Sequence, residues 1–167
     1  MAVSHWHGEL WLGRDFGLIH GAMGPTEPHA HYAHQLIIAP GQPVTVALAG
    51  GLQSAHYLLI PALQRHAIVQ APEQAFTVYA EPLLIAVEDL QACVSGAAPS
   101  LPGLEAALRR CPRQLVADPR VARALHAVDA ALEGKVAAAQ LAARAHVSLS
   151  QLAVSYTHLR AHETGRN

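Results

Sequence analysis

Four side chains between positions 29 and 66 have the types and the spacing to bind a metal ion. His29 and His31 are separated by one residue, and Gln35 follows four residues after the second histidine. A further histidine, His66, ends the stretch Pro-Ala-Leu-Gln-Arg-His. Neutral imidazoles bind zinc, iron and other divalent ions, whereas a glutamine offers only a weak, uncharged oxygen. This set indicates a divalent metal site, or a ligand pocket, without a carboxylate.

Strand alternation decides which of these side chains can share one site. If the first stretch forms a strand, His29, His31 and Gln35 point to one face and His34 points to the other. We expect the first three to face the interior of a barrel together with His66, while His34 faces outward, unless a bulge intervenes. The nitrogens of the three barrel histidines should converge to within about 5 Å, which leaves room for metal bonds of ~2.1 Å.

The histidines also have an interpretation that needs no metal. They could line an apolar sensor pocket and form hydrogen bonds to a ligand, to water or to one another. A carboxylate in the set would neutralise part of the charge of the ion and would suit redox iron or manganese. Because Gln35 provides none, catalytic use of a metal is less expected, and we assign no catalytic residue.

The residues up to about Leu90 have the pattern of an antiparallel β-structure. Short apolar runs alternate with glycine and proline turn signals at regular spacing, which is typical of a sandwich or a barrel. The predicted strands cover residues 10–12, 17–19, 35–38, 44–47, 57–60, 67–69 and 76–79. One barrel over this region would bring the two histidine stretches together.

After Leu90 the hydrophobic period changes from two residues to 3.6, which predicts helices. Residues 95–103 are rich in glycine and proline and indicate a linker, and a short helix is expected around residues 104–108. We therefore divide this part of the chain into a β-domain, residues 1–92, and a linker with a short helix, residues 93–117.

The region 118–153 has the order helix, tight turn, capped helix. The first helix begins at Asp118, which caps free amides, and is followed by a proline in the first turn. A second helix is expected over 136–145, and residues 146–147 form a tight turn. Ser-Leu-Ser-Gln at 148–151 is a capping box that opens a third helix. This order is typical of a helix-turn-helix motif, although a generic three-helix bundle or a dimerisation module has the same elements.

Charge and cysteine content narrow the function classes. The chain has 167 residues, of which 51% are hydrophobic and 14% charged, so it can bury a core. Through position 92 it has two basic and seven acidic residues, and beyond it nine basic and five acidic ones, which points to nucleic acid on the basic side. Cys93 and Cys111 form no CxxC pair, so a reduced cytoplasmic location is expected. No signal peptide and no membrane-spanning stretch are recognisable.

The two histidine stretches resemble the motifs of cupin barrels. The first cupin motif has two histidines one residue apart and a glutamate four residues on, and the second has a proline followed five residues later by a histidine. His29, His31 and His66 fit by spacing. Gln35 stands in place of the glutamate, and Leu63 stands where the family usually has glycine. The resemblance implies an all-β, cupin-like jelly-roll barrel with a ligand site, and with a divalent metal as its cofactor if one is bound.

The helical region resembles the start of the DNA-binding domain of AraC-type transcription regulators. The similarity is carried by Asp-Pro-Arg-Val-Ala-Arg-Ala-Leu-His-Ala-Val from Asp118 and by Leu-Ala-Ala-Arg-Ala-His-Val-Ser from Leu141. It extends to about Leu152 and covers less than half of that domain, which has two helix-turn-helix units. The resemblance implies DNA as a partner, a small-molecule effector bound by the barrel, and assembly as a homodimer.

Four residues are the expected DNA contacts. The early residues of the helix opened at Ser148 would meet base edges in a major groove. Ser148, Ser150 and Gln151 lie there, and Gln151 could pair with adenine through two hydrogen bonds. Arg144, on the preceding helix, is expected to contact phosphate, which positions the protein without reading sequence.

Residues 154–164, Val-Ser-Tyr-Thr-His-Leu-Arg-Ala-His-Glu-Thr, match the translation of a transposase-end sequencing adapter in one reading frame. We therefore expect residues 154–167 to be an artefactual tail and the natural sequence to diverge after about Ala153. The alternative is a natural tail, and the genomic reading frame decides between the two. A DNA-binding domain truncated at this point is expected to have lost specific binding.

These patterns together favour a ligand-responsive transcription regulator, with a sensor barrel and a partial helix-turn-helix domain, and no enzymatic activity. The alternative is a small metal-dependent cupin enzyme, such as a dioxygenase or an isomerase, with a helical extension. Such an enzyme would need a tightly bound metal with an open coordination position.

Overall fold

The chain divides into two compact units, Met1–Arg113 and Gln114–Asn167. The computed structural model describes residues 8–129, 138–144, 146–148 and 150–151. Within these ranges, no helix is both long enough and apolar enough to cross a membrane.

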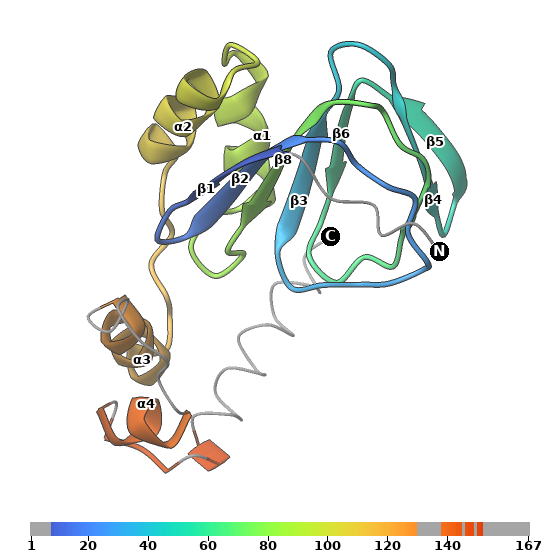
Figure 1. Ribbon diagram of the computed structural model, residues 1–167. Helices are drawn as coiled ribbons and strands as arrows, with labels where there is room; N and C mark the ends of the chain where they lie inside the picture. Colours follow the sequence, from blue (N-terminus) through green and yellow to red (C-terminus); the bar gives the residue numbers. More distant parts are fainter. Residues whose placement is uncertain (1–7, 130–137, 145, 149, 152–167) are drawn as a thin grey trace. The chain divides into compact units, whose positions relative to one another are not determined.

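Antiparallel strands build the first unit (Figure 1). They are β1 (Gly8–Leu12), β2 (Phe16–Gly21), β3 (His34–Ile38), β4 (Val44–Leu48), β5 (Gly51–Ala55), β6 (Tyr57–Ile60), β7 (Ala67–Gln70) and β8 (Ala75–Ala80). A five-stranded sheet has the order β1-β2-β8-β3-β6, and a three-stranded sheet has the order β5-β4-β7. The expected antiparallel β-architecture and all seven predicted strands are confirmed.

Strand β5 was not predicted from the sequence. Its residues Gly-Leu-Gln-Ser-Ala are almost all exposed, so no alternation of apolar and polar side chains marks them. The strand forms because a two-residue turn, Ala49–Gly50, returns the chain alongside β4, with Leu48 opposite Gly51. Gly51 has a φ of +113°, which glycine adopts without the strain that a side chain would add.

Cross-strand pairs define the two faces of the five-stranded sheet, because residues opposite each other on neighbouring strands point to the same side. The inner face carries two rows of residues: Leu12, Gly17, Tyr79, Gln35 and Ile60, and, beside it, Leu10, Ile19, Thr77, Ile37 and Leu58. Ile37, Leu58 and Ile60 share a core with Val46 of β4 and Ile68 of β7. The inner face is therefore the one that faces the three-stranded sheet.

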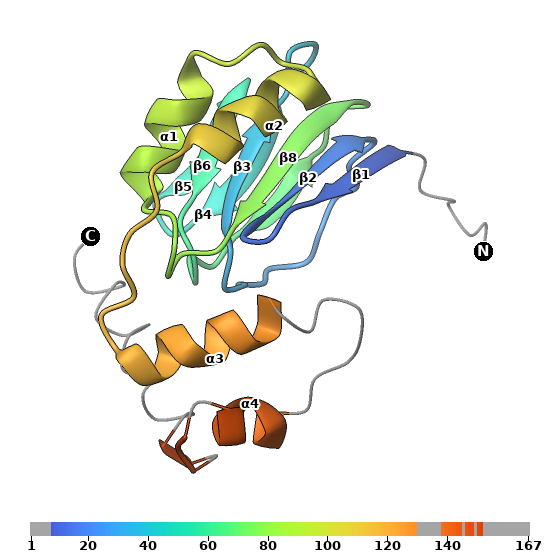
Figure 2. The ribbon, with the colours of Figure 1, turned by 90° about the vertical axis from the view of Figure 1, so that its left-hand side faces the viewer.

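Two helices, α1 (Val87–Ser95) and α2 (Leu101–Arg110), cover the outer face of the five-stranded sheet (Figure 2). Leu90 of α1 and Leu108 of α2 are fully buried in one core with Leu18 and Val78 of the sheet. Each fully buried leucine contributes roughly 1.5–3 kcal/mol of transfer free energy. The helices therefore belong to the first unit. This unit was expected to be all-β, but it contains both strands and helices.

The expected linker, residues 95–103, contains the last residue of α1 and the first turn of α2. The Ser100 hydroxyl accepts a hydrogen bond from the Gly103 amide at 3.2 Å and so caps α2. Pro102 fits here because amides of a first turn have no partner inside the helix. Serine, proline and glycine thus begin a helix rather than a linker, and the first unit continues past Ala92 to Arg113.

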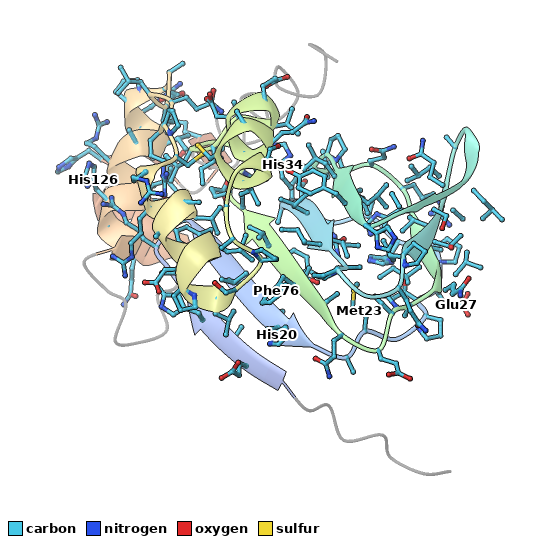
Figure 3. All side chains as sticks on the ribbon, turned by 90° about the horizontal axis from the view of Figure 1, so that it is seen from above. His20, Met23, Glu27, His34, Phe76 and His126 are labelled. Carbon is cyan, nitrogen blue, oxygen red and sulfur yellow. The ribbon has the colours of Figure 1, made fainter. Side chains whose placement is uncertain are left out.

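His34 points to the outer face, as strand alternation predicts, but it is not at the surface. Its pairing partner on β8 is Ala80, which in turn pairs with Phe16, and both belong to the core beneath the helices. The side chain of His34 is only 8% exposed and lies beside α1 (Figure 3). The predicted orientation away from the barrel interior is therefore confirmed, and the side chain is buried because α1 and α2 cover this face.

In the second unit, α3 (Pro119–Asp129) begins at the predicted cap. Asp118 Oδ1 accepts a hydrogen bond from the Arg120 amide at 2.8 Å, and the Asp118 carbonyl accepts one from the Ala122 amide at 3.0 Å. The side chain of Arg120 also forms an ion pair with Asp118. The start of this helix is therefore as predicted.

A tight turn follows α4 (Ala138–Arg144). The His146 amide donates to the Ala143 carbonyl at 3.1 Å, and the Val147 amide donates to the Ala142 carbonyl at 3.0 Å. His146 has a φ of +56°. This pair of hydrogen bonds with a left-handed residue is a Schellman motif, which ends α4 and confirms the predicted turn.

The capping box is also present. The Ser148 hydroxyl accepts a hydrogen bond from the Gln151 amide at 3.2 Å, and Gln151 Oε1 accepts one from the Ser148 amide at 2.9 Å. These reciprocal bonds satisfy two amides at the start of a helix. The rest of the predicted third helix and the adapter-like residues 154–164 lie outside the described residues.

The surroundings of His34 predict how stability depends on pH. Its Nδ1 accepts a hydrogen bond from the Ala62 amide at 3.0 Å, which requires an unprotonated nitrogen, and burial lowers its pKa, partly offset by Glu88. The unfolded state therefore binds this proton at a higher pH than the folded state does. As a result, the unfolding free energy should fall as pH drops below about 6.5.

Substitution of His34 tests this prediction in urea titrations between pH 5 and 8. In His34→Asn an amide oxygen replaces Nδ1 as the acceptor but does not titrate, so part of the acid destabilisation should vanish. His34→Ala leaves the Ala62 amide unpaired and should cost about 1–3 kcal/mol at pH 7.5. An unchanged pH dependence in His34→Asn would contradict the assignment.

Candidate metal centre

The two histidine stretches meet through their main chains. His29 and His66 form an isolated antiparallel bridge, in which each amide donates to the carbonyl of the other at 2.9 Å. The carbonyl of His31 accepts a further hydrogen bond from the Leu63 amide at 2.8 Å. Strand β3 begins only at His34, so the stretch from His29 is not the continuous strand expected. These hydrogen bonds, rather than strand alternation, bring the two stretches together.

Each of the three imidazoles is oriented by a main-chain carbonyl. The hydrogen bonds join His29 Nδ1 to Glu27 O at 2.8 Å, His31 Nδ1 to Ala33 O at 3.0 Å, and His66 Nδ1 to Gln64 O at 2.8 Å. A carbonyl oxygen can only accept, so Nδ1 carries the proton in all three rings. A neutral ring in this tautomer presents the lone pair of Nε2, which is the form that binds a metal ion.

The three rings converge, as predicted from their spacing. One nitrogen from each of His29, His31 and His66 lies within 4.8 Å of the others. The ring centroids are 4.4 Å apart for His29 and His66 and 5.1 Å for His31 and His66. His29 and His31 are half-buried, whereas His66 is only 2% exposed. The cluster is therefore closed on the side of His66 and accessible on the side of the other two.

His66 has a buried nitrogen without a partner. Among the described residues, its Nε2 is the buried side-chain atom that makes no hydrogen bond. An unsatisfied buried polar group costs about 1–3 kcal/mol, so such atoms are rare. Burial lowers the pKa of His66, and the nearby His29 and His31 lower it further, against an opposing effect of the Gln64 carbonyl. The ring is therefore neutral near pH 7, and a bound cation would satisfy the unpaired nitrogen.

Gln35 faces the cluster from β3 and is 2% exposed. Its Oε1 lies 3.1 Å from His31 Nε2, and its Nε2 donates to the Tyr79 hydroxyl at 3.1 Å. With the proton of His31 on Nδ1, two acceptors face each other. Metal bonds of ~2.1 Å place neighbouring ligand atoms about 3 Å apart, so a cation suits this spacing. Without a cation, a 180° rotation of the amide would pair both groups.

The donor set fits a divalent ion. His29, His31 and His66 supply three oriented lone pairs, and Gln35 adds an uncharged oxygen. No carboxylate joins the histidines in the group of potential ligands that the described residues form. The ion would keep its full double charge in this site and would act as a Lewis acid or hold an anion.

Tyr79, which the sequence analysis did not identify, also belongs to the site. Its ring lies 5.4 Å from that of His31, edge to face, and its hydroxyl accepts the hydrogen bond from Gln35. Burial raises its pKa, so the hydroxyl is protonated at pH 7. The signal in the sequence was weak, because only the pairing of β8 with β3 brings Tyr79 opposite Gln35.

The expected DNA contacts lie in the second unit. Arg144 is the last residue of α4, and Ser148, Ser150 and Gln151 follow the turn, where Ser150 and Gln151 are exposed. Gln151 Oε1 is engaged with the Ser148 amide, so it would have to leave the cap before it could pair with a base. The sequence predicted that Gln151 would both cap the helix and contact a base, and in the structure its side chain takes part in the cap.

Comparison with solved structures identifies several cupin proteins that are similar to this chain. An RmlC-like cupin from Shewanella frigidimarina NCIMB 400 has 12% identity and a TM-score of 0.37, over 44% of this chain and 73% of its own. A cupin 2 conserved barrel domain protein from Salinispora arenicola CNS-205 has 16% identity and a TM-score of 0.37, over 46% and 76%. A cupin domain from Bordetella pertussis Tohama I has 11% identity and a TM-score of 0.33, over 48% and 96%. No family model and no curated protein matches the chain.

Leu63 occupies a backbone conformation that favours glycine. Its φ is +64°, and its side chain is exposed. A left-handed residue with a side chain costs roughly 1–2 kcal/mol, of which the extra freedom of an unfolded glycine cancels roughly 0.5–1 kcal/mol. Leu63→Gly should therefore raise the unfolding free energy by about 0.5–1 kcal/mol in urea titrations.

Leu63→Ala is the matched control, because alanine removes the same exposed side chain but keeps the Cβ atom. It should give no such gain. A glycine variant that is less stable than the alanine variant would show that the backbone strain is absent.

Proposed function

We propose that the first unit is a cupin-like domain that binds one divalent metal ion at His29, His31 and His66, with Gln35 beside it. In this proposal the domain senses a small molecule for an AraC-type, DNA-binding transcription regulator. The single observation that carries the metal site is the set of three imidazoles, each fixed by a main-chain carbonyl so that Nε2 is the unprotonated nitrogen. The orphaned Nε2 of His66 supports it independently.

The chemistry of the donor set favours sensing over catalysis. When bound, the ion would supply a positive charge and one or more positions for an oxygen donor. The protein would orient that donor with the Tyr79 hydroxyl and the Gln35 amide, which are already hydrogen-bonded to each other. Neither group exchanges protons readily at pH 7, since an amide does not titrate and burial raises the pKa of Tyr79. The arrangement is suited to holding a ligand.

The regulator proposal also rests on the second unit. A Schellman turn at His146 is followed within two residues by the Ser148–Gln151 capping box. This joins the end of one helix to the start of another by a short turn, as a helix-turn-helix motif requires. Together with the AraC-like residues from Asp118, the local geometry supports DNA as the partner.

A metal-dependent cupin enzyme is the second candidate function. The half-buried positions of His29 and His31 favour it, because they leave one side of the cluster accessible to a substrate. Catalysis would also need a proton donor or acceptor that is not itself a metal ligand, and the groups beside the histidines, Gln35 and Tyr79, do not exchange protons readily at pH 7.

The first test is metal binding to chelator-treated protein, titrated calorimetrically with Zn²⁺ and Co²⁺. One ion should bind per chain, and the cobalt form should show the visible absorption of a nitrogen-ligated ion. His66→Ala should weaken binding at least about 100-fold, since one of three strong ligands is lost. Gln35→Glu should strengthen binding, because it adds a charged oxygen.

His56→Ala is the control, because His56 is exposed and its ring contacts the Ala39 carbonyl away from the cluster. It should bind the ion as the unchanged protein does. Equal binding by His66→Ala would contradict the proposed site, and no binding by the unchanged protein would contradict the metal proposal.

The second test measures DNA binding by fluorescence anisotropy at several salt concentrations. The chain should bind duplexes of different sequence equally, with a dissociation constant of about 10⁻⁴–10⁻⁶ M that rises steeply with salt. Extension with the genomic reading frame after Ala153 should add sequence preference of roughly 10³-fold or more. Complete absence of salt-dependent binding would argue against DNA as the partner.

A further inference from the structure

The inner face of the five-stranded sheet continues beyond its core as an exposed apolar surface. Leu10 and Leu12 of β1 are 56% and 71% exposed, and Ile19 of β2 is half-buried. We call these three residues the apolar shelf. They share the inner face with Ile37 and Ile60, which lie in the core between the sheets, but they are not part of that core. The shelf thus extends the lining of the barrel past its covered part.

The shelf is continuous with the candidate metal centre. Leu12 pairs with Gly17, Gly17 with Tyr79, and Tyr79 with Gln35, so the four residues form one row across the sheet. Strands in a sheet are about 4.8 Å apart, so this row is about 14 Å long. Tyr79 contacts the cluster at one end through Gln35, and Leu12 ends the row at the other.

Gly17 leaves open space within this row. A Cβ atom at Gly17 would have only one heavy atom within 4 Å, Leu12 Cδ2 at 3.4 Å. The absence of a side chain therefore leaves a gap between Tyr79 and Leu12 on the inner face. A slender apolar chain in this gap would pack against the Leu12 side chain.

The charge of the metal site indicates which chemical group a ligand would place beside the histidines. Its ligand set is uncharged, so a bound divalent ion would keep two positive charges, and a negative donor would be favoured there. The two inner-face rows contain no Asp, Glu, Lys or Arg residue. The residues that lead away from the cluster are thus apolar or neutral, which suits a ligand with one charged head and an uncharged body.

We propose that the cluster and the apolar shelf together bind one small carboxylate with an apolar tail. Its carboxylate lies at the histidine cluster beside Tyr79, and its tail crosses Gly17 to reach Leu10, Leu12 and Ile19. This inference rests on the proposed metal site. It assigns the ligand class that the sensor function leaves open.

A second copy of the chain is a poorer occupant of the shelf. A standard interface between proteins takes about 800 Å² from each partner, far more than two leucines and an isoleucine expose. The shelf also leads into the cluster, which a flat interface would not use.

The test is a series of linear carboxylates from acetate to octanoate, titrated by calorimetry into the zinc-loaded chain. Each methylene that reaches the shelf should strengthen binding by up to about fourfold, the ratio that corresponds to ~0.8 kcal/mol of burial. Leu12→Ser should flatten this dependence and leave the affinity for acetate unchanged. Gly17→Val should keep acetate binding and weaken binding of the longer chains, because its side chain fills the gap.

Leu52→Ser is the matched control, since Leu52 is an exposed leucine on β5, outside the inner-face rows. It should keep the full chain-length dependence. Affinity that is independent of chain length while zinc binds normally would overturn the shelf and leave the metal proposal intact. A Leu12→Ser variant that split a dimer into monomers would also overturn the shelf as a ligand site, because the shelf would then be an interface.

Failure of the chain to bind zinc would instead contradict the proposed function. In that case the same series without the ion still tests the shelf. A chain-length dependence that Leu12→Ser removes would support the apolar half of the proposal, and its absence would overturn it.

Discussion

The main-chain bridge between His29 and His66 is the constraint on which the candidate site depends. It joins two loops that are 37 positions apart, and each half of it is a hydrogen bond of 2.9 Å. The hydrogen bond from the Leu63 amide to His31 extends the same contact. Because the bridge fixes the backbone, each imidazole can be oriented by a carbonyl two residues away in its own loop. The side chains need no further support from the strands, which explains why a site with loop-borne ligands can still converge.

This constraint has an energetic cost at two positions, Leu63 and His66. Leu63 holds a left-handed backbone conformation with a side chain, and His66 buries a nitrogen without a partner. Strain and unsatisfied groups of this kind persist where the surrounding structure enforces them, and they gather at functional sites. Both lie in the loop between β6 and β7, whose tip Ala62 is held by buried His34 on the other face. The helix-covered core therefore stabilises the loop that carries the candidate metal ligand His66.

The sequence predicted the elements that have a periodic pattern and missed those that depend on partners. Alternation identified seven strands, and cap chemistry identified the starts at Asp118 and Ser148, because these signals are local. β5 has no apolar pattern and exists through pairing with β4, while α1 begins at Val87 and its N-cap residue, Ala86, makes no side-chain capping bond. Spacing predicted that three histidines converge, but it could not show which ring nitrogen is free, because the turn of each ring towards a carbonyl two residues away depends on the loop conformation.

The same limit applies to Gln35 and His34, which are neighbours on β3 but lie in different surroundings. Strand alternation placed them correctly on opposite faces, but their surroundings come from elements far away in the sequence. Gln35 meets Tyr79 of β8, and His34 meets Ala62 beneath the helices. The amide of Gln35 has two possible arrangements. Its oxygen faces His31 in the structure, which suits a cation between them, and a 180° rotation would turn its nitrogen towards His31 instead. A ligand shifts a protein only if it binds one arrangement better than another. Since Tyr79 contacts this amide and lies in the same row as the apolar shelf, occupancy of the ion site and of the shelf would act on one side chain. Gln35 is thus suited to couple metal to ligand, a role that a glutamate, permanently an acceptor at neutral pH, would not fill.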